Sequence, residues 1–491
     1  MNKLQKEIKN KRKTNLSESK EAKRRKEIES SSESDGDQFS VRNSEDEDED
    51  YDSFIQTITS KNQEVDFKTT EELTVKQRKI NMFDMEGMNP FLIVPLFNVM
   101  CNEFTQKTLE HPNFQKLLKS NEHFDAVIIE QFNNDALKGI AHHFNAPLIL
   151  FSTIGANSWV NYLVGNPSPP SYIPDALLSY RPDMTLIQRV VNWLFTVFSE
   201  LNRQLFFFPK QNKIMKEHFP HAPDLSTLNY NASIVLLNSH ESTNQPVPHV
   251  PNMIDIGGFH INPPKGITTG FKRLYGQRKG RKKEAILKAF GKLKQKVLWK
   301  WDEDDIPEKP ANIKLGKWFP QQDILAHPNT KLFITHGGLL STIETVYHGV
   351  PVLTVPIGGD QKLNGARAEM NGIGISLSFS TLTEEKFSDT LNKLLNNPKY
   401  RDTVKKRSAF LRDRPVKPLD LAIYWTEFVI RHNGAPHLRV AALDLSWYQY
   451  LLLDVLLFVA FVSVGSIIIL YIIVKGIFCA SKRNTEKVKK N

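Results

Sequence analysis

The chain has 491 residues, 40% of them hydrophobic, and a formal net charge of +10 at pH 7. This length is enough for two domains of ordinary size plus tails. Much of the positive charge is local, because residues 267–283 hold seven Lys or Arg and no acid, and residues 475–491 hold six against one Glu. No stacking aromatics alternate with base-reading groups, so we expect no nucleic-acid partner.

The first 50 residues consist largely of Lys, Arg, Glu, Asp and Ser. Such a composition buries too little apolar surface to offset the entropy of ordering, and we expect a disordered charged segment over residues 1–79. Basic clusters at residues 11–13 and 23–26 resemble a two-part nuclear import signal. A solvated charged tail would have the same composition.

An incomplete acceptor-side domain is predicted over residues 80–264. Apolar residues 128–130 read as a strand that ends on Glu130, followed by a helix over 135–144 and a strand over 146–151, which is a βαβ unit. Residues 234–238 predict another strand. The aromatic, Pro-punctuated stretch 155–220 favours helices around an acceptor pocket.

A basic insert or linker (265–283) separates this domain from a second one, predicted over residues 284–440. Its expected elements alternate in the same way: helices over 284–293 and 339–348, and strands over 296–301, 332–335 and 350–355. This alternation predicts a parallel α/β fold.

Residues 455–474 carry no charge over twenty positions, enough to cross a hydrocarbon core of roughly 30 Å as a helix. We expect a transmembrane helix there, followed by a basic cytoplasmic tail over residues 475–491. The two cysteines, Cys101 and Cys479, lie on opposite sides of this segment, which predicts no intrachain disulfide.

The strongest chemical signal follows the strand that ends at Thr335. Gly337 and Gly338 let the backbone turn into a helix whose free N–H groups and dipole point outward, which is an anion site. His336 can donate to a diphosphate there, and Ser341 adds a hydroxyl from the first turn.

Polar groups around this turn suit the rest of a nucleotide sugar. Glu344 can accept from two ribose hydroxyls, and Trp318 offers a flat face for a base. Asp360 and Gln361 follow the next strand, at the edge where α/β sheets bind ligands, and suit sugar hydroxyls.

This spaced set resembles the signature of the UDP-glycosyltransferases. Residues 414–419 and 447–450 resemble the animal membrane-bound branch, especially its insect members, and the resemblance covers about residues 80–266 and 284–491. It implies a GT-B fold: two Rossmann-like domains facing a cleft, with UDP held by the C-terminal one. The implied roles are uracil stacking by Trp318, nucleoside binding by Gln321 and Glu344, phosphate binding by His336, Gly338 and Ser341, and sugar binding by Asp360 and Gln361.

Members of this family transfer the sugar with inversion, without metal or further cofactor. Their general base is an N-terminal histidine oriented by an acidic residue, and that acidic position falls on Glu130. Nothing in residues 1–79 resembles the family's signal peptide, first strand or base histidine, and the strand ending in Ser-Leu-Gly-Ser is missing between Pro264 and Glu284. His142 and His143 lie on the predicted helix and are not nominated as the base.

We therefore expect transfer of glucose or glucuronate from a UDP-sugar to a hydroxyl of a small lipophilic acceptor. Two alternatives stay open: an impaired truncated isoform or non-catalytic UDP-sugar-binding membrane protein, which could associate with itself or with related transferases, and a nuclear or scaffold protein directed by the charged N-terminus. Localisation with and without residues 1–50 would discriminate the nuclear or scaffold protein from the other readings.

The charge around the predicted span sets its orientation. The tail is net +5, whereas residues 431–454 carry two Arg and two Asp, so the tail is expected in the cytoplasm. Its end resembles a dilysine retrieval signal, which predicts the endoplasmic-reticulum membrane with a lumenal body. The triplet from Asn231 to Ser233 is a glycosylation acceptor if that side is lumenal.

Overall fold

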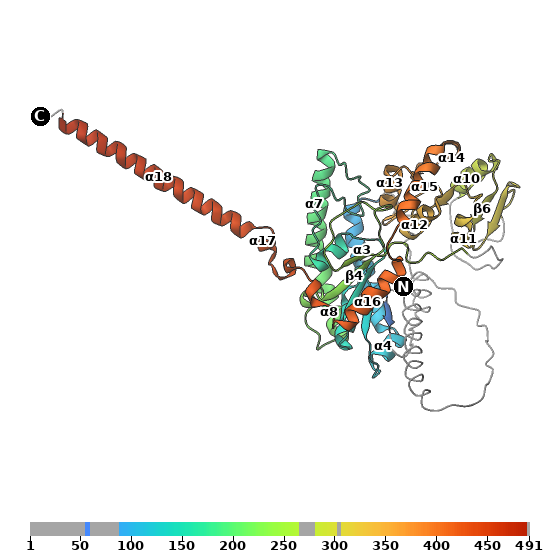
Figure 1. The fold of residues 1–491 in the computed structure, drawn as a ribbon, viewed down its shortest axis with the longest axis horizontal. Coiled ribbons are helices and arrows are strands. Elements are labelled where there is room, and N and C mark those ends of the chain that lie inside the picture. Colours follow the sequence, from blue (N-terminus) through green and yellow to red (C-terminus); the bar gives the residue numbers. More distant parts are fainter. Residues whose placement is uncertain (1–54, 59–87, 265–279, 302–305, 489–491) are drawn as a thin grey trace, which may run out of the picture. The chain divides into compact units, whose positions relative to one another are not determined.

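The computed structural model describes residues 55–58, 88–264, 280–301 and 306–488, and the chain divides into two units, Met1–Leu438 and Arg439–Asn491 (Figure 1). Most of the predicted disordered segment and most of the basic insert lie outside the described residues, as does the end of the tail.

The first unit contains a sheet in the order β1-β2-β3-β4-β5, five strands within the described residues. Strands β2 to β5 run parallel, and β1 pairs antiparallel with β2. The bounds are β1 Ile55–Ile58, β2 Ala126–Glu130, β3 Leu148–Ser152, β4 Ala232–Leu237 and β5 Met253–Asp255. The βαβ unit and the strand predicted at 234–238 are thus present within two residues of their predicted bounds.

Strand β1 falls in the stretch that the composition predicts to be disordered. Its residues pair with Ala126 to Ile129 of β2, whose outer edge would otherwise present unpaired backbone groups. Disorder is therefore wrong for these four residues, and composition failed there because the strand is specified by a partner distant in sequence.

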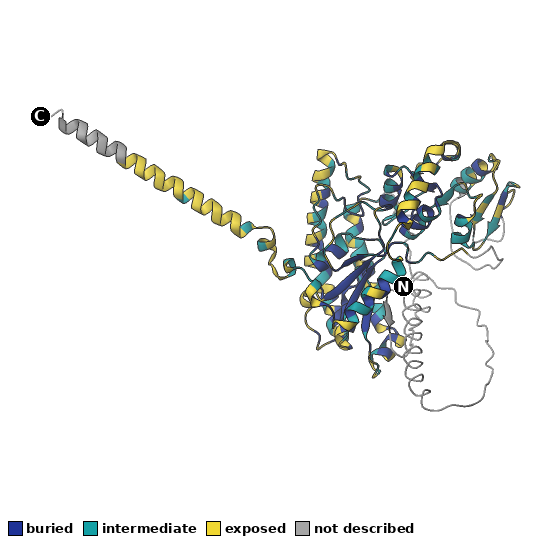
Figure 2. Ribbon diagram, viewed as in Figure 1, coloured by how far each residue is buried: buried dark blue, intermediate teal, exposed yellow. Residues whose placement is uncertain are grey.

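Both faces of this sheet are buried, as expected for parallel strands. On one face, Val127 and Ile129 pack with residues of α3, α4, α5 and α8. On the other, Ile128 and Phe151 pack with Ala422 and Ile423 of α16. Figure 2 shows the strands as the buried layer of this unit.

The helices around the first sheet come mainly from residues 90–228. The predicted helix at 135–144 is a 3-10 turn, η2, continued by α5, and the stretch 155–220 is largely helical, as predicted. The bounds are α3 Pro90–Glu110, α4 Pro112–Leu118, η2 Asp135–Lys138, α5 Gly139–His143, α6 Ser158–Asn161, η3 Tyr162–Val164, α7 Leu186–Asn202, the π-helical η4 Arg203–Phe207, α8 Phe208–His218 and α9 Leu225–Leu228.

The second half of this unit has parallel strands in the orders β10-β9-β8 and β6-β7 among the described residues. The bounds are α10 Gly280–Gly291, β6 Val297–Lys300, β7 Ile313–Gly316, α11 Gln321–Ala326, β8 Phe333–Thr335, α12 Leu339–His348, β9 Val352–Thr354, α13 Gln361–Met370, β10 Gly374–Ser376, α14 Glu384–Asn396 and α15 Pro398–Arg412. The predicted helix 339–348 is confirmed at both ends, and the α/β class is confirmed.

Helix α16 (Pro418–Arg431) follows the second set of strands in sequence but contributes to the core of the first sheet. Its buried residues Ala422, Thr426 and Val429 lie three to four residues apart, which places them on one helical face. The short turn η5 (Pro436–Leu438) completes the unit. The alternation of elements predicts a second domain that extends to residue 440, whereas α16 packs on the first sheet.

The second unit comprises η6 (Ala441–Asp444), α17 (Trp447–Tyr450) and α18 (Leu453–Val488). Within α18, Leu453–Gly476 has a mean hydropathy of 2.8, and its most apolar window is 0% buried. A core helix of a soluble protein would be largely buried. The described residues thus contain one candidate membrane span, which includes the predicted residues 455–474.

Candidate active site

The turn from β8 into α12 brings backbone N–H groups to the end of a parallel strand. Gly337 has φ of +90°, a conformation that side chains disfavour. A Cβ on Gly338 would lie 2.7 Å from His336 Nε2, so the ring of His336 lies directly over the Gly338 backbone. Helix α12 has no side-chain cap, and its first N–H groups are therefore available to an anion.

Glu344 lies one turn into α12 and is only 4% exposed. Its two oxygens accept from different amides: Oε2 from Gln321 Nε2 at 2.6 Å, and Oε1 from Gln322 Nε2 at 3.1 Å. Gln321 Nε2 also lies 3.2 Å from Ser341 Oγ. The structure thus joins the predicted residues Gln321, Ser341 and Glu344 in one network.

His336 is exposed, while the protein around it lowers its pKa by desolvation, with a smaller contribution from Lys300 and an opposing one from Asp360. A lowered pKa keeps the ring neutral at pH 7. A neutral imidazole carries one N–H, so His336 can give a single hydrogen bond to an anion.

Asp360 and Gln361 begin α13, beyond the end of β9. Asp360 Oδ2 accepts from Asn364 Nδ2 at 2.7 Å, and the same nitrogen lies 3.0 Å from the carbonyl oxygen of Gly337. Burial raises the pKa of Asp360, with Asn364 opposing the shift. Gln361 Oε1 accepts from the N–H groups of Ile357 and Gly358. Asn364 therefore links the Asp360 loop to the glycine turn.

Trp318 lies in the segment between β7 and α11 and is 37% exposed. The next residue, Phe319, packs over Gly316, where a Cβ would lie 2.6 Å from the ring. Gly316 thus gives this aromatic segment its close approach to β7, and the indole face of Trp318 stays partly open to solvent.

Glu130 ends β2 in the first sheet, as predicted, and its Oε1 accepts from Thr153 Oγ1 at 2.8 Å. The backbone oxygen of Glu130 accepts from Asn134 Nδ2 at 2.8 Å, which fixes the loop after the strand. His142 and His143 are exposed at the end of α5.

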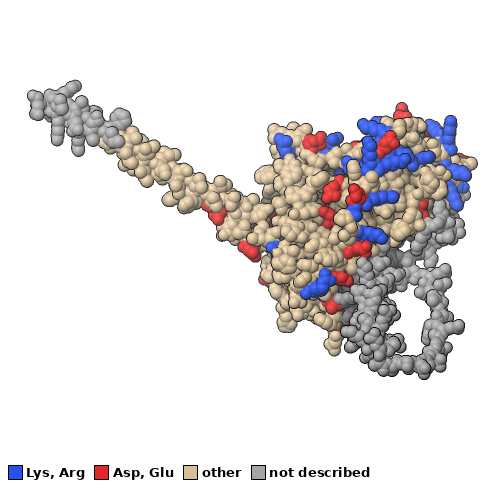
Figure 3. Space-filling view, in the orientation of Figure 1, with Lys and Arg blue, Asp and Glu red and all other residues tan. Residues whose placement is uncertain are grey.

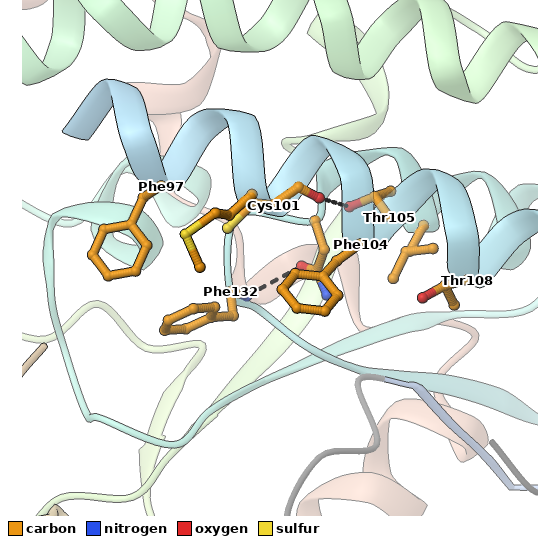
Figure 4. A pocket seen from close by; sticks show the side chains of 9 residues that line it. Phe97, Cys101, Phe104, Thr105, Thr108 and Phe132 are labelled. Carbon is orange, nitrogen blue, oxygen red and sulfur yellow. Dashed lines mark hydrogen bonds between the residues drawn. The ribbon is translucent and has the colours of Figure 1, made fainter. Parts of the chain in front are cut away.

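A cavity of about 50 Å³ lies beside this loop, beneath α3. The rings of Phe97, Phe104 and Phe132 point toward it in Figure 4, and Asn134 and Leu137 also line it. Cys101 on α3 lines the same space and forms no disulfide. The cavity is mainly apolar and lies outside the 155–220 stretch that was expected to surround an acceptor pocket.

Lys and Arg side chains gather over the part of the molecule that carries α10, α14 and α15 in the view of Figure 3. Positive charge on this half attracts anionic ligands over a distance.

Sequence reasoning missed two residues of the network around Glu344. Gln322 follows Gln321 in the motif but was given no role, and His260, whose Nε2 lies 3.4 Å from Glu344 Oε1, belongs to a segment 84 positions earlier. The adjacent glutamines of the motif indicate Gln322. No local sequence pattern indicates His260.

Comparison with known proteins agrees with the motif. The family model described as "UDP-glucoronosyl and UDP-glucosyl transferase" matches residues 30–491. The chain is 39% identical over 425 residues to "UDP-glycosyltransferase UGT5" of Dactylopius coccus, covering 79% of this chain and 81% of that protein. It is 30% identical over 407 residues to the human "UDP-glucuronosyltransferase 2B7", covering 79% and 76%.

Among solved structures, a complex of "a UDP-glucosyltransferase from Polygonum tinctorium capable of glucosylating indoxyl" aligns with a TM-score of 0.46 and 16% identity, over 68% of this chain and 82% of that one. The family model covers most of the chain, and two relatives match at 30% identity or more over most of its length. The chain therefore belongs to the UDP-glycosyltransferase family, whose GT-B class has the α/β architecture described above.

Proposed function

We propose that the chain binds a UDP-sugar at the carboxyl ends of β8 and β9 for transfer of its glucose or glucuronate. The observation that carries the proposal is the buried Glu344 carboxylate, held by two amides one turn into a helix whose N-terminus is uncapped.

The hydrogen-bonding capacity of Glu344 fits a ribose. A carboxylate offers about four acceptor positions, and the amides of Gln321 and Gln322 take two of them. Acceptor capacity on Oε2 remains for a ribose hydroxyl. Trp318 would stack on the uracil from the neighbouring segment.

The diphosphate would lie at the start of α12. Its oxygens would accept from the N–H of Gly338 and the following residues, from His336 and from Ser341 Oγ. The proposed chemistry at this site needs no metal and no cofactor beyond the UDP-sugar.

The hexose would reach the loop that precedes α13. Asp360 Oδ1 can accept from a sugar hydroxyl because Asn364 occupies only Oδ2. The side-chain oxygen of Gln361 is engaged by backbone N–H groups, which leaves its Nε2 as the group that donates to the sugar.

A small lipophilic acceptor would enter beside Glu130, with part of its apolar surface against the Phe97, Phe104 and Phe132 cavity. At about 50 Å³ this cavity is smaller than typical ligand pockets of roughly 300–1,000 Å³, so it would hold one end of the acceptor. Glu130 would orient the family's base histidine when that residue is present.

We place residues 80–264 as the acceptor-side domain and 284–440 as the donor-binding domain, with the core of the former completed by α16. The Leu453–Gly476 helix would anchor the protein in the endoplasmic-reticulum membrane with its body lumenal, alone or associated with related transferases. The apolar span and the net +5 tail support this arrangement.

Calorimetry of UDP binding to the full chain in detergent micelles tests the donor site. His336→Ala and Glu344→Ala should each weaken binding about 10- to 100-fold, the usual cost of a lost hydrogen bond to a charged group. Glu385→Ala, an exposed carboxylate on α14, serves as the control and should bind normally. Unchanged affinity in both site variants would remove the assignment.

A further inference from the structure

The segment that leaves the first sheet after β5 runs directly to the proposed donor site. Gly257 approaches the backbone so closely that a Cβ would lie 2.4 Å from the carbonyl oxygen of Ser239, and Gly258 has φ of +90°. These two positions fix the direction of the chain. His260 therefore reaches the second half of the unit on a defined path.

Two successive contacts between aromatic rings position the ring of His260. Phe259 is 5% exposed, and its ring centroid lies 5.4 Å from that of Phe151 in β3. The His260 ring lies 5.6 Å from Phe259 in turn. The first sheet thus sets the position of the imidazole.

Both ring nitrogens of His260 are buried, and within the described part of the chain neither has a hydrogen-bond partner of good geometry. Nε2 lies 3.4 Å from Glu344 Oε1. A buried donor next to a buried carboxylate gains most of its stabilisation from that carboxylate, because no water competes for either group.

Gln322 completes the link between the two segments. Its Nε2 donates to Glu344 Oε1 at 3.1 Å and lies 3.3 Å from the carbonyl oxygen of His260. Its Oε1 accepts from the N–H of Asn262 at 2.8 Å. One glutamine side chain therefore binds the His260 backbone and the Glu344 carboxylate together.

We infer that His260 is a positioning residue of the donor site, which orients Glu344 toward the ribose hydroxyls from outside the donor-binding domain. The inference rests on the proposed donor site. With Gln322 and His260 on Oε1 and Gln321 on Oε2, the carboxylate is confined to one orientation, and its open acceptor position on Oε2 points in one direction. Without the ring, the carboxylate can rotate and lose that alignment.

Ligands that lack the ribose hydroxyls separate this role from a structural one. Calorimetry would compare UDP with 2′,3′-dideoxy-UDP on the full chain and on His260→Ala, both in detergent micelles. We expect the substitution to weaken UDP binding about tenfold, and dideoxy-UDP binding less than about twofold. In the Glu344→Ala background, His260→Ala should cause no further loss.

Two variants keep the test decisive if the alanine variant folds poorly. His260→Phe retains the ring packing on Phe259 without a nitrogen and should behave as the alanine variant does. His260→Gln retains a donor at a similar reach and should bind UDP within about threefold of the unmodified chain. His142→Ala, an exposed histidine on α5, is the matched control and should bind both ligands normally.

Equal losses for both ligands would assign His260 to the fold alone and overturn the inference. So would normal UDP binding by His260→Phe. If Glu344→Ala itself left UDP binding intact, the donor site would be wrong, an outcome distinct from the failure of His260 alone.

Discussion

At the residue scale, two buried acidic side chains of this protein differ in their neighbours. Asp135 is fully buried, and its Oδ1 accepts from Lys138 Nζ at 2.5 Å and from Gln131 Nε2 at 2.9 Å. Lys138 in turn donates to Asn229. Glu344 also accepts from two amides, but those amides belong to Gln321 and Gln322, which are only partly buried. The Asp135 cluster is closed, which suits a structural role, whereas the Glu344 network borders solvent.

Removing one partner from the closed cluster should destabilise the fold. Burial lowers the pKa of Lys138, and Asp135 opposes that shift, so the pair depends on its mutual contact. Lys138→Met should cost about 3–5 kcal/mol, because Asp135 would remain as an uncompensated buried charge. The measurement is the Tm of the full chain in detergent.

The matched control for this prediction is Lys107→Met on α3, which removes an exposed pair with Glu103. Exposed pairs contribute about 0–1 kcal/mol, so the control should leave Tm nearly unchanged. A Tm for Lys138→Met equal to that of the control would contradict the structural role of the cluster.

The roles of side chains could be predicted from the sequence only where the residues of the site lie a few positions apart. Ser341 and Glu344 lie three residues apart, which places them on one face of a helix, and Gln321 joins them in the structure. His260 could not be predicted in this way, since its approach depends on two glycines and on a phenylalanine packed against another sheet.

At the element scale, the β8–α12 turn depends on one backbone conformation. Gly337→Ala should destabilise the turn by about 1–3 kcal/mol, because φ is +90° and a Cβ would lie 3.2 Å from the carbonyl oxygen of Gln361. UDP affinity should fall as the helix N–H groups shift. Calorimetry and Tm measure the two effects.

Gly358 provides the control for that substitution in the neighbouring loop. A Cβ there would meet nothing within 4 Å, and its φ is not positive. Gly358→Ala should therefore leave both Tm and UDP affinity close to those of the unmodified chain. Equal behaviour of the two alanine variants would show that the turn tolerates a side chain.

The apolar helix gives a second prediction at this scale. When a signal sequence is supplied, the chain should cross the membrane once through Leu453–Gly476, with its Lys-rich tail in the cytoplasm. Added protease should then remove a C-terminal epitope from intact microsomes while the body stays protected. The reverse pattern would refute the charge argument.

Elements were predictable where one local signal determined them. Helix α12 matches its predicted bounds because an apolar face begins after two glycines and ends at Gly349, which adopts a left-handed conformation. Strand β1 and the packing of α16 could not be predicted, because each is stabilised by a sheet far away in sequence.

At the scale of the whole molecule, the described residues contain more of the proposed donor site than of the proposed acceptor site. The donor side has its carboxylate network, its glycine turn and its Asp360 loop. On the acceptor side, Glu130 is bound to Thr153, and the first histidine of the sequence is His111, which caps α4. Donor binding and catalysis should therefore be separable in this chain.

We expect the 491-residue chain to bind UDP but to transfer sugar slowly. An acceptor hydroxyl loses its proton as it attacks the sugar, and a positioned base contributes about 10²- to 10⁴-fold to such a step. Glu130 alone would be a weak substitute, because its Oε1 already accepts from Thr153 at 2.8 Å. The edge of β2 is also occupied by the antiparallel β1, where a doubly wound fold would continue with parallel strands.

The experiment compares this chain with a version that carries the family's N-terminal segment and Ser-Leu-Gly-Ser strand, and both are assayed with a phenolic acceptor. UDP affinity should be similar in both, while turnover should rise at least about 100-fold in the second. Comparable turnover would mean that the residues present suffice for catalysis, and that Glu130 or another group serves as the base.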